Sequence, residues 1–248
     1  MSTTHNRLEI YVDVFDEENQ RALPLAELKP AEFVQAILEE FRHSQMEFLG
    51  DDADDYMLIR ADNGSTLISN VPLDEQLEKG DRLVLQEKKL SLPADTHRPT
   101  RPLYFRELST SRVFRIQWVP AFIGRPDPTQ PHDDRLAVNL RFIETGLRVS
   151  RRHAQILEER GRFFIQSLSS NPTSVIRDRN ANPIPVTSMP VALHPGDIVI
   201  LDRSNIMLKV IIRDDSLRSA KDAGAGRDEE SQSRFDSNNS PDKKEMSS

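Results

Sequence analysis

Three short segments decide how this sequence is interpreted: Gly124-Arg125, Val149-Ser150-Arg151-Arg152-His153-Ala154 and Ser169-Ser170-Asn171-Pro172-Thr173. All three lie in a strand-rich region, residues 103–213. They place an arginine, a serine hydroxyl and an asparagine amide beside turn-forming residues. These are the donors that charge-assisted recognition of a phosphoryl group requires. The segments therefore predict an oxyanion-binding site built from loops.

In order and spacing, the three segments resemble the forkhead-associated (FHA) domain, and the resemblance covers residues 103–213. It implies an all-β sandwich whose loops at one end hold a phosphothreonine peptide without catalysing a reaction. The protein is then expected to be an adaptor and not an enzyme. The resemblance implies two sets of residues: the phosphopeptide-binding residues Arg125, Ser150, Arg151, Asn171 and Thr173, and the structural motif residues Gly124 and His153.

Two positions depart from the family pattern. Pro172 replaces the usual glycine of a Ser-x-Asn-Gly-Thr loop, and Ser167 replaces an aspartate. Proline fixes φ near −65° and has no N–H, so a glycine-dependent turn cannot form at this position. The Asn171 side chain can still be presented, which leaves the effect of Pro172 on phosphate binding open.

Spaced apolar runs with turn signals between them predict the strands of the sandwich. His194-Pro195-Gly196-Asp197 forms a turn like the Leu-x-x-Gly-Asp segment that precedes a late strand in FHA domains. This turn supports the resemblance independently of the phosphate loops. The expected strands are 114–119, 137–140, 153–157, 163–165, 198–201 and 207–212.

The N-terminal region predicts a second, α+β domain at residues 6–89. Two extended runs, 8–15 and 21–28, are expected to form a hairpin around an Asp-Glu-Glu-Asn turn. Pro30 suits the first turn of a helix whose apolar face is formed by Phe33, Val34, Ile37, Leu38 and Phe41. Three short strands are expected at 56–60, 65–69 and 82–86.

The expected order ββαβββ is that of a β-grasp, and the region resembles a ubiquitin-like domain of the small bacterial type found with type VII secretion systems. The chain has no terminal di-glycine after Lys88-Lys89-Leu90 and continues into another domain, so conjugation to a target is not expected. A fused protein-interaction module is the simpler interpretation.

The other two segments lack the pattern of a folded domain. Residues 90–102 are proline-rich and charged, which favours an extended, semi-rigid linker. Residues 214–248 are rich in Ser, Asp, Asn, Lys and Gly, and are expected to form a disordered tail. The predicted fold class is therefore multidomain: a ubiquitin-like β-grasp, an FHA sandwich at 103–213 and a disordered C-terminal tail.

The composition argues against a metal site, a cofactor and a membrane span. The 248 residues include no cysteine and six scattered histidines, so no metal site or cofactor is expected. The acidic run 50–55 lacks the alternating ligands, central glycine and closing glutamate of an EF-hand loop, which argues against calcium. No apolar run approaches the length of a membrane span and the polar N-terminus is not a signal peptide, so a cytoplasmic location is expected.

Charge is divided unevenly along the chain. Residues 1–102 carry 11 basic and 21 acidic residues, a net −10, whereas residues 103–213 carry 16 basic and 10 acidic residues, a net +6. Arginine accounts for 15 of those 16, so bidentate recognition of phosphate is available in addition to electrostatic steering. The basic region is therefore suited to an anionic ligand.

Three functions are consistent with the sequence. The first is a phosphothreonine-reading adaptor in Ser/Thr kinase signalling, whose partners are phosphorylated kinase substrates, with the ubiquitin-like domain as a second interaction module. The second is a phosphate-independent scaffold associated with type VII-like secretion. The third is nucleic-acid binding, which is disfavoured because aromatic and basic residues do not alternate along a strand. Enzymatic function has the least support, because no serine hydrolase elbow, P-loop or kinase signature is present.

Overall fold

The computed structural model describes residues 6–42, 46–127, 129, 135–178 and 182–214. The expected disordered tail, residues 214–248, lies outside the described residues apart from Asp214. None of the helices in the described residues is long and apolar enough to span a membrane.

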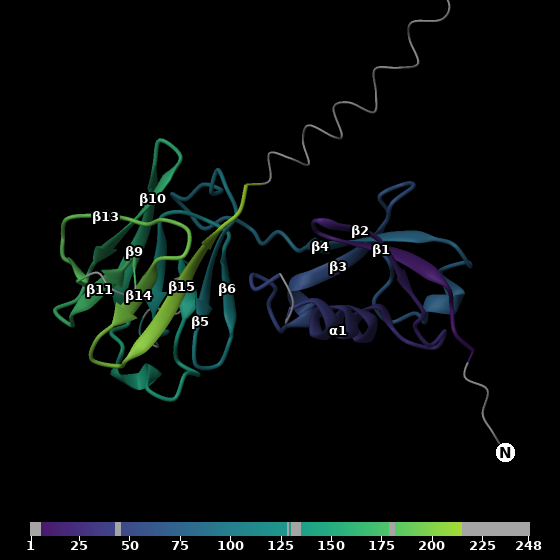
Figure 1. Ribbon diagram of the computed structural model, residues 1–248, viewed down its shortest axis with the longest axis horizontal. Helices are drawn as coiled ribbons and strands as arrows, with labels where there is room; N and C mark the ends of the chain where they lie inside the picture. The colour runs from purple at the N-terminus through teal and green to yellow at the C-terminus, as the bar shows by residue number, and fades with distance from the viewer. Residues whose placement is uncertain (1–5, 43–45, 128, 130–134, 179–181, 215–248) are drawn as a thin grey trace, which may run out of the picture. The chain divides into compact units, whose positions relative to one another are not determined.

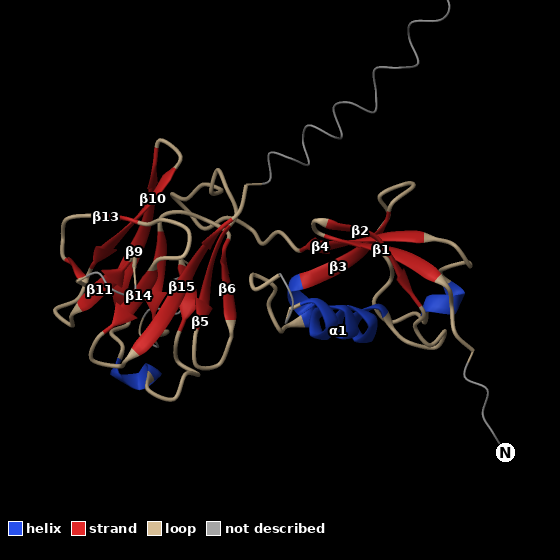
Figure 2. Ribbon diagram, in the orientation of Figure 1, coloured by secondary structure: helices blue, strands red, loops and turns tan. Residues whose placement is uncertain are grey.

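Residues 10–87 form a mixed four-stranded sheet with one α-helix along one face (Figures 1 and 2). The sheet order is β2-β1-β4-β3; β1 pairs parallel with β4, and the other neighbours are antiparallel. Two short 3-10 turns, η1 and η2, complete the region. The elements are β1 (Ile10–Val14), β2 (Glu17–Ala22), α1 (Pro30–Phe41), η1 (Ala53–Asp55), β3 (Tyr56–Arg60), η2 (Leu73–Glu75) and β4 (Arg82–Glu87).

Helix α1 forms where the sequence predicts it. Pro30 occupies the first turn, where its missing N–H costs nothing, and the Glu32 carboxylate accepts a hydrogen bond from Lys29 N at 2.8 Å. The apolar residues spaced three and four apart face the sheet, and Phe33, Val34, Ile37 and Leu38 are buried. The predicted amphipathic helix is confirmed.

Two predicted strands are wrong in this region. The second strand runs over 17–22 and not 21–28, because the chain already reverses at Phe15, whose φ is +52°. The segment 65–69 is not a strand and makes only an isolated bridge between Thr66 and Ile59. The Gln76 side chain bonds both the N–H and the C=O of Ile68, so these backbone groups do not need a longer β-ladder.

Residues 103–212 form two antiparallel-rich sheets packed face to face, as the sequence predicts. The five-stranded sheet has the order β13-β10-β9-β7-β8, and the six-stranded sheet has the order β12-β11-β14-β15-β5-β6. Their shared core includes Phe105, Ile123, Ile156 and Val199, all fully buried. The elements are β5 (Leu103–Glu107), β6 (Val113–Ile116), β7 (Ala121–Gly124), β8 (Leu136–Asn139), η3 (Gly146–Arg148), β9 (Arg152–Glu159), β10 (Arg162–Ser167), β11 (Thr173–Ile176), β12 (Ile184–Val186), β13 (Val191–Ala192), β14 (Ile198–Leu201) and β15 (Ile206–Ile212).

The six predicted sandwich strands correspond to β6, β8, β9, β10, β14 and β15, and the turn before β14 is also found. In that turn Gly196 has a φ of +87°, and the buried Asp197 carboxylate accepts from His194 N at 2.9 Å. Strands β5, β7, β11, β12 and β13 were not predicted.

Part of the linker is hydrogen-bonded to the sandwich. His97 exchanges backbone hydrogen bonds with Val119, and Thr100 donates both its N–H and its hydroxyl to the Glu158 carboxylate. Arg101 donates to the carbonyl of Gly161 at 3.2 Å. The expectation of a semi-rigid spacer is therefore wrong for residues 97–101, which are bonded to Val119, to β9 and to the turn after β9.

Candidate functional site

The first candidate residue, Arg125, is placed by the end of β7. At Gly124, β7 lies so close to the segment before β9 that an added Cβ would stand 2.1 Å from the Arg151 carbonyl oxygen. Only glycine fits this close approach, which supports the structural role expected for Gly124. Arg125 follows at once, and its Nε donates to the Val149 carbonyl at 2.8 Å. That bond orients the guanidinium, whose terminal nitrogens make no hydrogen bond to a described residue.

A network of short polar side chains joins the second and third motifs. The hydroxyls of Ser150 and Ser169 are 2.6 Å apart, and the Asn171 side-chain amide donates to Ser150 Oγ at 3.0 Å. The Asn171 backbone N–H donates to Ser169 Oγ, also at 3.0 Å. Pro172 does not prevent this arrangement, because Asn171 reaches Ser150 without a positive φ. The structure thus brings Ser150 and Asn171 together, as the sequence predicts.

Arg125, Ser150 and Asn171 line a common cleft of about 530 Å³. Among the described residues three arginines line it and no carboxylate does, so the cleft offers positive charge and hydrogen-bond donors to an anion. One wall also holds an apolar side chain, Leu147, which is 71% exposed. The described residues that line the cleft are Arg125, Leu147, Arg148, Val149, Ser150, Asn171 and Arg203.

Thr173 does not reach this cleft, contrary to the sequence expectation. It is 3% exposed in β11, and its hydroxyl lies 2.8 Å from His153 Nε2. His153 is itself buried, and burial lowers its pKa. Thr173 therefore packs with the structural histidine, and Asn171, two residues earlier, is the side chain of this loop that lines the cleft.

Arg151 is also separate from the cleft. It is exposed just before β9 and forms an ion pair with Asp127, with 3.3 Å between Nη1 and Oδ1. Hydrogen bonds from the Thr129 hydroxyl and N–H, together with the arginine charge, hold the pKa of Asp127 below its usual value. The Arg151 guanidinium therefore already has an anionic partner on the surface.

Sequence reasoning missed Arg148, Ser169 and Arg203. Arg148 ends η3, two residues before Ser150, and Ser169 lies in the third motif, where the FHA resemblance implies no role for it. Arg203 lies in the turn between β14 and β15 and donates to Asn171 Oδ1 at 3.2 Å. The sequence of that turn has no motif that indicates a binding site. The turn lies beside Asn171 because β14 pairs with β11.

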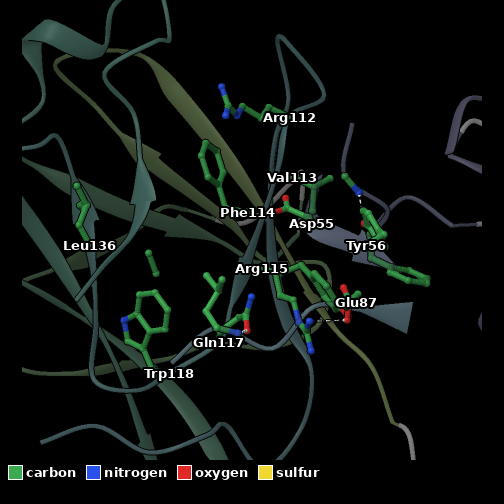
Figure 3. Close-up of a pocket in the computed structure, with 15 residues that line it drawn as sticks. Asp55, Tyr56, Glu87, Arg112, Val113, Phe114, Arg115, Gln117, Trp118 and Leu136 are labelled. Carbon is green, nitrogen blue, oxygen red and sulfur yellow. Dashed lines mark hydrogen bonds and ion pairs between the residues drawn. The ribbon is translucent and has the colours of Figure 1, made fainter. Parts of the chain in front are cut away.

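A second cavity, of about 230 Å³, is unsuited to a phosphate group (Figure 3). Two of its charged residues are paired with each other, with Arg115 3.1 Å from the Glu87 carboxylate, and Tyr56 Oη accepts from the N–H of Gly50. Burial raises the pKa of Asp55 there. The cleft at Arg125 is therefore the better candidate site for an anion.

Comparison with known proteins identifies the family of the sandwich. The FHA domain family model matches residues 122–202, which run from β7 to just past β14. None of the curated protein sequences compared with the chain matches it.

Solved FHA structures also resemble part of the chain. The FHA domain of human APLF in complex with an XRCC1 bisphospho peptide is 20% identical, with 44% of this chain and 97% of that chain covered and a TM-score of 0.33. Mycobacterium tuberculosis EmbR in complex with a low affinity phosphopeptide is 22% identical, covering 45% of this chain and 24% of that one, with a TM-score of 0.32. The FHA domain of an Arabidopsis thaliana hypothetical protein is 20% identical, covering 50% and 96%, with a TM-score of 0.33. With the family match over residues 122–202, this chain contains an FHA domain.

Proposed function

We propose that this protein is a non-enzymatic adaptor whose FHA domain binds phosphothreonine peptides at the cleft lined by Arg125, Ser150 and Asn171. The observation that carries the proposal is the polar network beside three arginines, in a cleft whose described lining includes no carboxylate. Charged hydrogen bonds to a phosphate dianion are among the strongest available to a surface site.

The hydrogen bonds of the network favour one proton arrangement for ligand binding. Ser169 Oγ accepts from Asn171 N and can donate to Ser150 Oγ, which also accepts from the Asn171 amide. The proton of Ser150 is then left to donate to a phosphate oxygen, as is the second N–H of the Asn171 amide. Arg125 adds its terminal nitrogens, and Arg148 and Arg203 supply further positive charge.

Selectivity for threonine over serine follows from the FHA resemblance, which implies a small apolar niche for the threonine γ-methyl. A phosphoserine ligand would leave that niche empty, and loss of one methyl contact costs about 1 kcal/mol. The upstream kinase, the cytoplasmic location and a second, ubiquitin-like interaction module with a type VII-like secretion partner are further parts of the proposal, each resting on the sequence.

The proposal is tested with the full chain and a degenerate phosphothreonine peptide library, with phosphoserine and unphosphorylated libraries beside it. Binding should depend on phosphothreonine and fall at least tenfold in both Arg125→Ala and Ser150→Ala. Arg162→Ala is the matched control, because Arg162 is exposed on β10 and does not line the cleft. Absence of phosphate-dependent binding in the unmodified chain would favour the phosphate-independent scaffold instead.

A further inference from the structure

The cleft proposed to bind phosphate carries more positive charge than one phosphate group balances. Its described lining includes Arg125, Arg148 and Arg203 and no Asp or Glu. A phosphothreonine carries about −1.5 to −2 at pH 7, so it would leave roughly one of the three arginine charges without an anionic partner. The cleft, at about 530 Å³, also exceeds the volume of a single phosphate group. It therefore has both the charge and the room for a second anionic group.

The three arginines differ in the contacts that they already make. Arg125 Nε donates to the Val149 carbonyl at 2.8 Å, and Arg203 donates to Asn171 Oδ1 at 3.2 Å. The Arg148 guanidinium makes no hydrogen bond or ion pair with a described residue, and Arg148 is exposed. Arg148 is therefore the arginine whose side-chain donors are all available to a ligand.

The backbone places Arg148 next to Ser150 on the cleft side of the loop. Val149, between them, is buried and extended, with φ −80° and ψ 140°. Side chains alternate along an extended backbone, so residues 148 and 150 share a face, with their Cα atoms about 6.6 Å apart. An extended ligand advances about 3.3 Å per residue. A group one or two residues from the phosphothreonine would therefore lie opposite Arg148.

The charge of the cleft determines which group that is. Glu144, the carboxylate of the loop between β8 and β9, does not line the cleft, so the described part of this loop supplies no counterion there. A basic side chain of the ligand would be repelled by the arginines, whereas an acidic one would be attracted. Carboxylate and phosphate groups can each accept two parallel hydrogen bonds from a guanidinium. The cleft therefore favours an anionic neighbour of the phosphothreonine.

We propose that the cleft binds phosphothreonine segments with a second anionic group, a carboxylate or a phosphate, one or two residues from the phosphothreonine, and that Arg148 binds this group. Arg125, Ser150 and Asn171 bind the first phosphate. This inference rests on the proposed function, because it specifies which phosphothreonine segments the same site prefers. Arg148 is then a residue that determines specificity.

The test uses the full chain and phosphothreonine peptides whose other flanking residues are neutral. One arm places Glu, Gln or Lys in turn at each position from three residues before the phosphothreonine to three residues after it. The other arm places phosphoserine or serine at the same positions, which separates the two sources of the anion. Glu or phosphoserine at a position within two residues should raise the affinity of the unmodified chain about fivefold, since an exposed charge pair contributes up to about 1 kcal/mol.

Variants of the arginine separate a direct contact from a general effect of charge. Arg148→Ala should reduce the preference for Glu over Gln to less than twofold, and Arg148→Glu should reverse it in favour of Lys. The matched control is Arg141→Ala, because Arg141 is an exposed arginine of the same loop that does not line the cleft, and it should leave the preference unchanged. A reversed preference also shows that the variant is folded, because an unfolded site would bind none of the peptides.

Two results would overturn the inference. One is phosphothreonine-dependent binding that gains nothing from Glu or phosphoserine within two residues, and the other is a gain that persists in Arg148→Ala. Both leave the proposed adaptor function intact, since the neutral phosphothreonine peptides still bind. If no peptide binds in a phosphothreonine-dependent way, the proposed function itself fails and this inference fails with it.

Discussion

Arg203 and Asn171 are joined by a hydrogen bond from the Arg203 guanidinium to Asn171 Oδ1, at 3.2 Å, although 32 residues separate them in the chain. The bond fixes which way the Asn171 amide points, because with Oδ1 engaged the nitrogen faces Ser150 Oγ. Arg203 thus acts on the candidate phosphate site in two ways, as a nearby positive charge and as the residue that orients the asparagine.

Replacing Arg203 with alanine should therefore weaken binding of a phosphothreonine peptide about tenfold, because a hydrogen bond to a charged group contributes about 1.5–3 kcal/mol. Isothermal titration calorimetry with a peptide selected by the library would measure the loss. Arg151→Ala is the informative comparison, since Arg151 is paired with Asp127 outside the cleft and its removal should change affinity less than twofold. An equal loss in both variants would mean that general surface charge, and not the Asn171 contact, determines affinity.

Gly124→Ala should destabilise the sandwich by more than about 2 kcal/mol, because the new Cβ would meet the backbone of Arg151, which cannot move aside cheaply. Gly196→Ala is the comparison: its Cβ would meet no atom within 4 Å, so its cost is that of a positive φ alone, about 1 kcal/mol. Trp118, the single tryptophan, lies in the sandwich core and reports its urea unfolding by fluorescence. Equal destabilisation in the two variants would contradict the close approach at Gly124.

Much of the fold could be predicted from residue patterns because local spacing determines it. Helix α1 follows from apolar residues three and four apart after Pro30, and β9 and β14 follow from short apolar runs next to turns. The segment 65–69 has a similar strand pattern and was predicted wrongly. There, a side chain from residue 76 satisfies the backbone, and no feature of the segment itself indicates that.

The candidate site could be predicted only in part for the same reason. Arg125, Ser150 and Asn171 lie in motifs with recognisable spacing, and the structure places them in one cleft. Arg203 lies in the same cleft because β14 pairs with β11. Thr173 lies outside the cleft because its side chain in β11 points toward His153. The positions of these two residues depend on long-range pairing and packing, and not on the residues next to them in sequence.

Stability should fall in mild acid because of His153. Burial disfavours its charged form, so its pKa in the folded protein lies below the ordinary value of 6.5. As pH decreases through 6.5 the unfolded chain binds a proton that the folded chain does not, which favours unfolding; above 6.5 the full contribution of the neutral histidine is present. Urea unfolding followed by Trp118 fluorescence between pH 5 and 8 should therefore show a midpoint that rises with pH.

The control for this pH dependence is His153→Gln, which keeps a polar partner for Thr173 but does not titrate in this range. Its absolute stability is expected to be lower, so the slope against pH is the quantity to compare. A slope near pH 6 that is the same with and without the histidine would assign the effect to other groups.

The contact between Thr100 and Glu158 should hold the linker against the sandwich. The Glu158 side chain is only 2% exposed, and both the N–H and the hydroxyl of Thr100 donate to its carboxylate. Glu158→Ala should therefore speed hydrogen exchange of the Thr100 amide, because its acceptor is gone. The His97 amide, which donates to the Val119 carbonyl at 2.9 Å, is the internal control and should keep its protection. Thr100→Glu should have the same effect as Glu158→Ala, because it sets a second carboxylate against the first. If the amide of residue 100 keeps the same protection in all three chains, the backbone bonds at His97 alone hold the linker in place.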